Sequence, residues 1–192
     1  MVATLKQSWR GSSEPWGAMR TAVQNIMDVL NALVPSANLS LEKGAGVPVV
    51  PSSAVAAGSA LTLTAASHSG RLIQLDTATG STVTLPASSG SGAVFECVVT
   101  VLATSNSHII KVANGTDVMV GYVLNQDTDT ANAFTGFNTT STSDTITLNR
   151  STTGSVSIGE RIRLRDVKTG FWTVEGYTTS TGAPATPFSA TV

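Results

Sequence analysis

The two side chains best suited to acid–base chemistry near neutral pH are the histidines, His68 and His108. Imidazole is the side chain whose ordinary pKa lies closest to neutrality, but a catalytic histidine also needs a nucleophile or a carboxylate that works with it. His68 lies in the polar stretch Ser67–Gly70, and His108 leads into the apolar segment Ile109–Val112. Neither segment contains a recognised catalytic motif, so we expect both histidines to be structural or solvated.

Carboxylates offer a second route to chemistry, because a pair of them in a cleft can cleave a glycosidic bond. A polysaccharide depolymerase built from this chain would have to draw its pair from Asp76, Asp117, Asp144 and Glu175. No spacing selects two of the four. The chain also lacks the signatures of serine hydrolases, zinc proteases and phosphate-binding loops. We therefore expect no catalytic residues, no cofactor and no enzymatic activity.

Oxygen-bearing side chains alternate at 125–129, where the sequence is Asn-Gln-Asp-Thr-Asp. Many calcium-binding loops begin this way, but the glycine and the distant glutamate of an EF-hand are missing. Aspartate and asparagine are also favoured in turns, because their side chains hydrogen-bond to nearby backbone. We interpret the segment as a polar turn and expect no metal site, with calcium as the lesser alternative.

Arginines occupy every second position of one short segment, where Arg161, Arg163 and Arg165 alternate with Ile162 and Leu164. In a β-strand, alternate side chains point to opposite faces. The three arginines would then share one face while the two apolar residues face the core. Such a ladder is a candidate interface for an acidic neighbouring surface; the alternative is an ordinary solvated face, since isolated surface charges contribute little.

The composition disfavours several classes of partner. Charged residues make up 12% of the 192 residues, the net charge is −1 and the pI is about 6.1. This charge creates no field that would attract nucleic acid or an anionic membrane. No apolar run is long enough to cross a bilayer, and residues 1–10 lack the apolar stretch of a signal peptide. We expect a product made in the cytosol, in which the lone Cys97 packs as a small hydrophobe.

The chain is predicted to contain an N-terminal arm (1–12), an amphipathic helix (13–34), a linker (35–59) and an all-β domain (60–192). The arm shows no clear period. A Ser-Glu-Pro sequence opens the helix, because it supplies a capping hydroxyl, an acidic first turn and a proline that needs no N–H there, and Pro35 ends it. The linker is rich in glycine, proline, alanine and serine, so it is expected to act as a semi-rigid spacer.

An apolar seam runs along one face of the predicted helix. Its members follow each other at intervals of three or four residues, and so narrow a seam on a helix of about 20 residues needs a partner to be stable. That partner is either the same helix of other subunits, which we favour, or the chain's own β-domain. The seam consists of Met19, Val23, Ile26, Leu30 and Leu33.

The remainder of the chain is rich in short strand signals. Serine and threonine supply about a quarter of all residues, and the branched Cβ of threonine, valine and isoleucine suits a pleated surface. We predict a mainly β fold whose body is an antiparallel β-sandwich, a jelly roll or a small barrel. The predicted strands are 61–64, 72–75, 82–85, 94–102, 109–112, 118–124, 133–137, 145–148, 161–167 and 171–177.

Three segments of this body resemble one another: Gly58–Leu63, Gly80–Leu85 and Ser143–Leu148. The repeats of a solenoid need a nearly fixed period, whereas the separations between these segments differ. We therefore interpret them as similar strands of hairpins.

Several phrases of the body resemble β-domains of tailed-bacteriophage virion proteins, and most closely those of small capsid decoration (cement or head-fibre) proteins. The resemblance covers most of the chain after the linker. The phrases are LTLTAA (61–66), IQLDTATGSTVTLPA (73–87), TSNSH (104–108), ANGTDVM (113–119), GFW (170–172) and TPFSA (186–190).

This resemblance implies a homotrimer on the outer surface of the virion capsid, bound to the major capsid protein. In that setting Trp9, Arg10 and Trp16 are candidate capsid anchors, because exposed aromatic and arginine side chains are common anchors of interfaces. The alternative is a host-attachment module of a tail fibre or spike that recognises a surface glycan.

Overall fold

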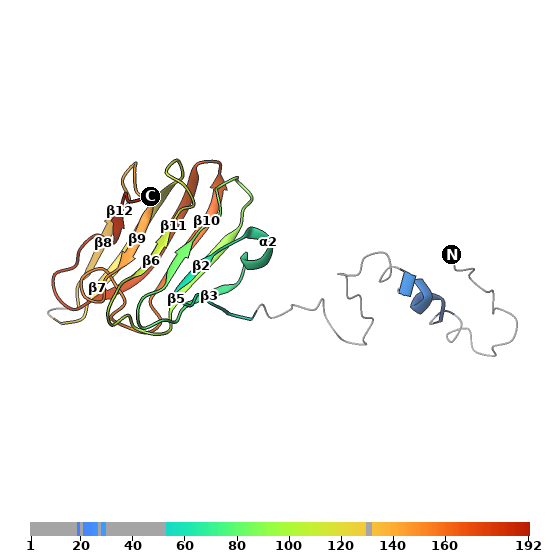
Figure 1. The fold of residues 1–192 in the computed structure, drawn as a ribbon, viewed down its shortest axis with the longest axis horizontal. Coiled ribbons are helices and arrows are strands. Elements are labelled where there is room, and N and C mark those ends of the chain that lie inside the picture. Colours follow the sequence, from blue (N-terminus) through green and yellow to red (C-terminus); the bar gives the residue numbers. More distant parts are fainter. Residues whose placement is uncertain (1–18, 20, 27, 30–52, 130–131) are drawn as a thin grey trace, which may run out of the picture. The chain divides into compact units, whose positions relative to one another are not determined.

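The computed structural model describes residues 19, 21–26, 28–29, 53–129 and 132–192 (Figure 1), and the chain divides into two units, Met1–Val50 and Pro51–Val192. In the first unit every described residue is helical, and all of them fall within 13–34, for which the sequence predicts a helix. The predicted arm, 1–12, and most of the predicted linker lie outside the described residues.

The second unit is built from β-strands and one short helix. Strand β1 lies inside the range 35–59 that the sequence predicts as linker, so the β-rich unit begins earlier than expected. The elements are β1 (Val55–Ala56), β2 (Ala60–Thr62), α2 (Ala65–His68), β3 (Leu72–Leu75), β4 (Thr82–Thr84), β5 (Val94–Val99), β6 (His108–Lys111), β7 (Val118–Asp127), β8 (Phe134–Asn138), β9 (Thr145–Leu148), β10 (Arg161–Lys168), β11 (Phe171–Ser180) and β12 (Phe188–Ser189).

The strands form two mixed sheets. Sheet A has seven strands in the order β1-β3-β5-β10-β11-β7-β8, and sheet B has five in the order β12-β9-β6-β4-β2. Five of the strand pairs are parallel: β1 with β3, β3 with β5, β7 with β11, β2 with β4, and β4 with β6. The fold is mainly β as predicted, but the prediction of antiparallel pairing throughout is wrong.

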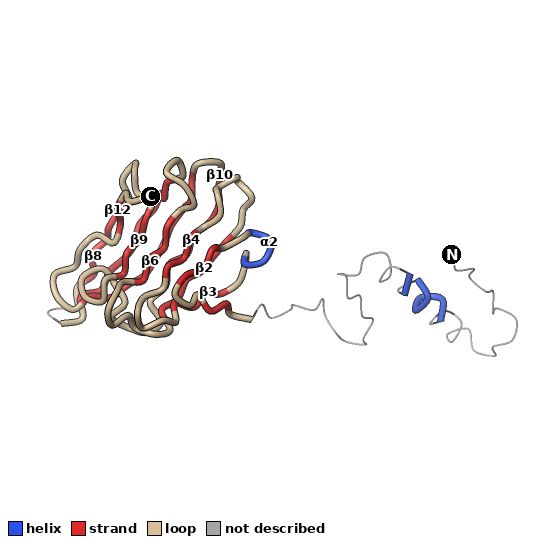
Figure 2. Tube along the Cα trace, viewed as in Figure 1, coloured by secondary structure: helices blue, strands red, loops and turns tan. Residues whose placement is uncertain are grey.

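Four of the five parallel pairs, all except β7 with β11, arise because the chain alternates between the sheets from β1 to β6, with odd-numbered strands in sheet A and even-numbered strands in sheet B. Each strand therefore returns beside the strand two before it and runs in the same direction, and the intervening strand in the other sheet provides the crossover that parallel pairing requires. Figure 2 shows β2, β4, β6, β9 and β12 side by side in this arrangement.

The interpretation of the three similar segments as hairpin strands is also wrong. They contain β2, β4 and β9, which all belong to sheet B, and β2 pairs with β4 in parallel. Their likeness reflects equivalent positions in one sheet. In register across sheet B lie the inward-facing residues Leu61, Val83, Ile110, Ile146 and Phe188.

One cluster of buried hydrophobic side chains draws on both sheets. Sheet B contributes the row just described, and sheet A contributes buried residues such as Ile73, Ile162 and Trp172. Cys97 belongs to the same cluster, as predicted, and burial raises the pKa of its thiol to about 12, with the neighbouring Glu96 adding to the effect. A neutral thiol therefore packs there as a small hydrophobe.

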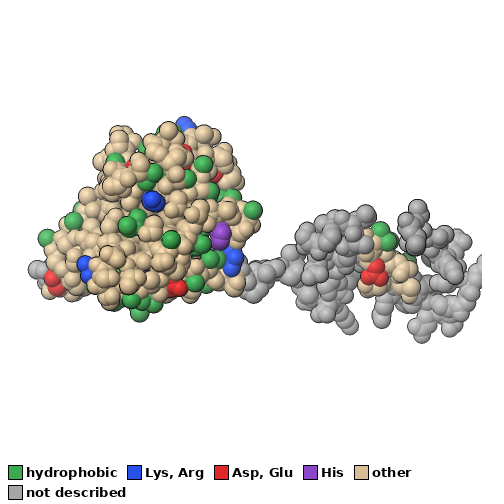
Figure 3. Space-filling view, viewed as in Figure 1, with side chains coloured by type: hydrophobic (Ala, Val, Ile, Leu, Met, Phe, Trp, Pro, Cys, Tyr) green, Lys and Arg blue, Asp and Glu red, His purple; other side chains and the backbone are tan. Residues whose placement is uncertain are grey.

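Few charges are visible on the face of the β-rich unit that Figure 3 draws. This face is dominated by uncharged polar groups and backbone, with isolated cationic and anionic side chains and scattered hydrophobic ones. Charged residues make up only 12% of the whole chain, so the cluster of arginine and glutamate on sheet A, described next, is a distinctive feature.

Candidate functional site

The outward face of sheet A carries several charged and aromatic side chains of the β-rich unit. Strand β10 alternates between exposed and buried positions, with Ile162 and Leu164 fully buried and Arg161, Arg163 and Arg165 exposed. The predicted facing of the arginine ladder is thus confirmed. Whether the ladder contacts another molecule is a separate question, and it remains a prediction.

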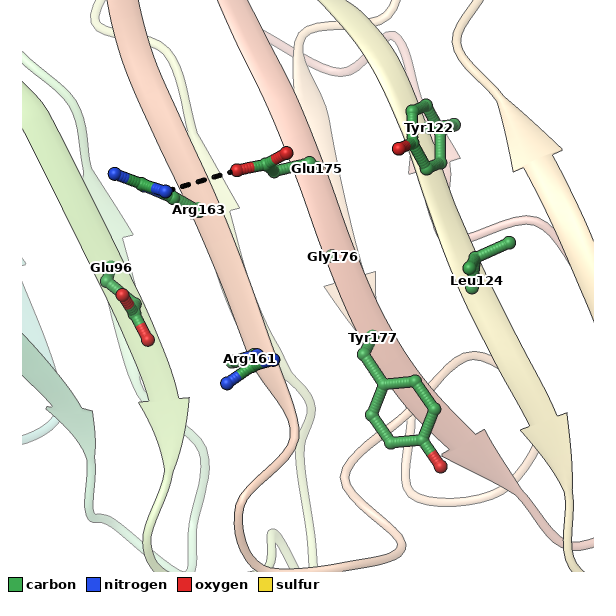
Figure 4. Close-up of a pocket in the computed structure, with 8 residues that line it drawn as sticks. All are labelled: Glu96, Tyr122, Leu124, Arg161, Arg163, Glu175, Gly176 and Tyr177. Atoms are coloured by element: carbon green, nitrogen blue, oxygen red, sulfur yellow. Dashed lines mark hydrogen bonds and ion pairs between the residues drawn. The ribbon is translucent and has the colours of Figure 1, made fainter.

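Pairing with the neighbouring strands places carboxylates on both sides of Arg163. Glu96 of β5 and Glu175 of β11 are its cross-strand partners, and Tyr122 of β7 is the partner of Glu175. The Arg163 guanidinium donates to the Glu175 carboxylate across 3.4 Å, with the two side chains 49% and 58% exposed (Figure 4). Four strands therefore contribute one row of side chains to this face.

A second row lies one step along the strands and contains Arg161, Tyr177 and Leu124 in register. The Tyr177 hydroxyl donates a hydrogen bond to the Gln126 side-chain oxygen, and its ring packs against Phe134 of β8 with centroids 6.3 Å apart. These two contacts hold the Tyr177 ring in one position beside the arginines.

Between and beside these rows lies a depression of about 400 Å³ (Figure 4). It adjoins a second depression of about 440 Å³ that shares Tyr122, Arg163 and Glu175 with the first. We call the two together the sheet A groove. Its side-chain lining is Glu96, Val120, Tyr122, Leu124, Arg161, Arg163, Arg165, Thr173, Glu175 and Tyr177.

Buried carboxylates fix both ends of the strand that carries the arginines. Before β10, the Glu160 carboxylate accepts hydrogen bonds from the backbone N–H groups of Ser155, Val156 and Ser157 at 2.6 to 2.7 Å, and from the Thr179 hydroxyl at 2.5 Å. Near its other end, Asp166 accepts from the backbone of residues 89–91. Hydrogen bonds near both ends therefore hold strand β10, which carries the arginines of the groove, in a fixed position.

Both histidines occupy structural positions. His108 is fully buried: its Nδ1 accepts a hydrogen bond from the Ser81 backbone N–H at 2.9 Å, so the other nitrogen, Nε2, carries the proton and donates to the Val101 carbonyl at 2.9 Å. Burial lowers the pKa of His108. His68 ends the short helix α2, where its Nδ1 accepts from the Thr64 N–H.

The four candidate carboxylates of a depolymerase have separate contacts. Asp76 accepts from the Gly58 N–H, and Asp117 accepts from the Ser88 N–H. Asp144 accepts from the backbone of residues 191 and 192; burial alone would raise its pKa, but these hydrogen bonds and one from the Thr145 hydroxyl outweigh that effect and lower it. Glu175 is the partner of Arg163, as described above. The first three thus serve local backbone structure.

The segment 125–129 does not form the predicted polar turn. Its first three residues are the end of strand β7, with Asn125 and Asp127 facing inward. The Asn125 side chain donates to the Thr178 hydroxyl and accepts from the Ser180 hydroxyl, at 2.9 and 2.7 Å. No group of three or more potential metal-binding side chains occurs in the part of the chain that the structure describes.

The described members of the helical seam are exposed to solvent: Met19, Val23 and Ile26 are 51%, 38% and 54% exposed. Val29, on the same helix, is 48% exposed. Leu30 and Leu33 of the seam lie outside the described residues, as do the candidate anchors Trp9, Arg10 and Trp16. Within the described ranges no helix is both long and apolar enough to cross a membrane.

Sequence reasoning missed Tyr122, Tyr177 and Glu96 as members of the candidate site. One signal was available in the segment 118–124, which is apolar at almost every position. A strand with such a sequence has apolar residues on both faces, and here Val120, Tyr122 and Leu124 lie on the face opposite the core. The proximity of Glu96 to the arginines had no local signal, because it depends on the pairing of β5 with β10. Comparison of the chain with protein-family models, with curated proteins and with solved structures found no match.

Proposed function

We propose that this chain is a non-enzymatic structural protein of a bacteriophage virion, a homotrimeric decoration protein on the outside of the capsid. The observation that carries the proposal is the exposed apolar seam on the N-terminal helix. The N-terminal unit gathers the subunits and attaches them to the major capsid protein, while the β-rich unit is displayed outward. The sequence segments that resemble tailed-bacteriophage virion proteins support the same proposal.

The seam supports self-association for a simple physical reason. Met19, Val23 and Ile26 are each more than a third exposed in the single chain, and covering such side chains removes about 25 cal/mol of unfavourable free energy per Å² of apolar surface. Their spacing of four and three residues is that of coiled-coil seams, which pack against the same seam of other helices. A single isolated helix of this length is marginal in water.

The β-rich unit supports the display role through its construction. We infer that its two sheets form a β-sandwich, since one hydrophobic cluster draws on both and each sheet has two distinct end strands. Few charges and many hydroxyl side chains limit non-specific attraction to nucleic acid and to anionic membranes. Attachment through Trp9, Arg10 and Trp16 is part of the proposal, because aromatic and arginine side chains fill interface pockets well.

Sedimentation of the purified full chain tests the assembly. We expect a trimer at micromolar concentration, and we expect Ile26→Asp to dissociate it, because a charge in a packed seam loses its hydration. Asn25→Asp is the matched control: it introduces the same charge at an adjacent, exposed position and should leave the trimer intact. A wild-type chain that sediments as a monomer would contradict the proposal.

Immunogold microscopy tests the location. An antibody against the β-rich unit should label the heads of intact virions of the phage that encodes the chain. The second candidate function is a tail-fibre or spike module that binds a host glycan, and the sheet A groove is the observation that favours it. Label on the tails instead of the heads would support that alternative.

A further inference from the structure

The floor of the sheet A groove limits what can bind there. Strands β10, β11 and β7 are each paired on both sides, with β5 next to β10 and β8 next to β7, so their backbone N–H and C=O groups are engaged in the ladders of the sheet. A ligand on this face therefore cannot add as a further strand, which requires a free sheet edge. Recognition has to come from side chains that stand up from the sheet.

The charged side chains of the first depression balance one another. Arg161 and Arg163 face Glu96 and Glu175, which gives two cations and two anions around one hollow. The side chains of Glu96 and Arg161 make no hydrogen bond or ion pair with any other described residue, and the side chains of Arg163 and Glu175 share one long contact of 3.4 Å. Most of their donors and acceptors thus remain available to a ligand that carries no net charge.

The chemistry of these groups selects hydroxyls. Guanidinium groups only donate hydrogen bonds and carboxylates only accept them, whereas a hydroxyl does both. A ligand with several neighbouring hydroxyls can therefore bridge Arg161 to Glu96, or Arg163 to Glu175, with charge-assisted hydrogen bonds. A planar guanidinium and a planar carboxylate can each contact two adjacent hydroxyls.

Two tyrosines add apolar contact surface next to these polar groups. Tyr122 is 48% exposed, and the Tyr177 ring is held by Gln126 and Phe134. The face of an aromatic ring carries negative charge density, which attracts weakly positive C–H groups. A pyranose ring has such a C–H face and hydroxyls around its rim, and a ring held in advance loses little entropy when a ligand packs against it.

The length of the groove indicates more than one sugar unit. Its two depressions share Tyr122, Arg163 and Glu175, and their volumes of about 400 and 440 Å³ each lie in the range of small-ligand pockets. We propose that the sheet A groove binds a neutral oligosaccharide, with Tyr122 and Tyr177 packing against sugar rings and Arg161, Arg163, Glu96 and Glu175 contacting their hydroxyls. This proposal does not depend on the capsid role, because the groove lies wholly in the β-rich unit.

Titration of the full chain with defined sugars tests it. The probes are maltohexaose, cellohexaose and mannohexaose, with hexagalacturonate as the acidic comparator, observed by saturation-transfer NMR and by calorimetry. We expect at least one neutral hexasaccharide to bind at one site per chain. Tyr122→Ala and Arg161→Ala should each weaken that binding by about tenfold or more, as expected for the loss of a central contact.

The matched control is Ile158→Ala, which truncates a 70% exposed side chain that does not line the groove. It should leave the affinity unchanged, and all variants should keep the wild-type thermal unfolding midpoint. The proposal is overturned if no neutral hexasaccharide binds at millimolar concentration, if hexagalacturonate binds more tightly, or if Tyr122→Ala leaves sugar binding intact. A change of oligomeric state in Tyr122→Ala would instead identify a second copy of the chain as the occupant, and would also overturn it.

Discussion

Asp166 and Ser91 are joined by two hydrogen bonds: the Asp166 carboxylate accepts one from the Ser91 backbone N–H at 2.9 Å and one from its hydroxyl at 2.7 Å. The same carboxylate accepts from the N–H groups of Ser89 and Gly90. Burial alone would raise the pKa of Asp166, but these hydrogen bonds outweigh it and lower the pKa to about 2. The loop before β5 is thereby tied to the strand of the arginine ladder.

Asp166→Asn should destabilise the protein by about 2 kcal/mol near neutral pH, because a pKa lowered from 3.8 to about 2 corresponds to roughly that free energy. A carboxylate whose pKa is lowered in the folded state stabilises that state at every pH above its pKa in the unfolded chain. This stabilisation is lost as the pH falls from about 4 towards 2. Urea unfolding at neutral pH and at about pH 3 measures the free energy of unfolding of the variant and of the wild type, and shows how their difference changes with pH. Glu175→Gln, at an exposed position, is the control and should change little. Equal acid sensitivity of Asp166→Asn and the wild type would contradict this account.

His108 should make the folded state sensitive to mild acid. Burial lowers the pKa of His108 below 6.5. Just below pH 6.5 the histidine is therefore protonated in the unfolded chain but still neutral in the folded chain. The free energy of unfolding is then at its highest above about pH 6.5 and falls as the pH decreases below it. Chemical unfolding at pH values on both sides of this point measures the slope. His108→Leu should flatten the slope, whereas His68→Gln should retain it; an unchanged slope in His108→Leu would show that another group is responsible.

Ile110→Ala should cost about 2–5 kcal/mol of stability, because Ile110 is fully buried in the hydrophobic cluster and its truncation leaves a cavity. The neighbouring Ile109 is an ideal control, since the same residue type lies on the opposite, partly exposed face of strand β6. Ile109→Ala should cost well under half as much. Denaturant unfolding compares the two, and similar losses would mean that both faces of β6 are equally covered in the native assembly.

Gly121→Ala should prevent normal pairing of β7 with β11. Gly121 has a φ of 150°, and a Cβ there would lie 1.8 Å from the Val174 carbonyl oxygen, so the backbone would have to move. We expect a loss of more than about 3 kcal/mol or an insoluble product. Gly136→Ala, on the adjacent edge strand, is the control, because its nearest neighbour is the Leu124 side chain at 3.6 Å. Wild-type stability in Gly121→Ala would contradict the observed register.

The sequence by itself determined which segments form strands and, at 161–165, which way the side chains face. Every predicted strand overlaps an observed one, and among the elements that the structure describes only the two-residue strands β1 and β12 and the short helix α2 were missed. The alternation of arginine with isoleucine and leucine at 161–165 correctly predicted one exposed and one buried face. Such predictions succeed because the period of two is a local property of an extended chain that needs one face buried.

Only the tertiary structure decided which strands pair. The similar segments around β2 and β4 gave no sign that the chain visits the other sheet between them, so hairpins were predicted where parallel pairs occur. The sheet A groove depends on the same information: Glu96, Tyr122 and Arg163 come from strands far apart in the sequence and meet only through the register of β5, β10, β11 and β7. Strand pairing depends on contacts between residues that are far apart in the sequence. The observed pairing is the one that buries the apolar faces of both sheets in one core, and no local sequence pattern encodes it.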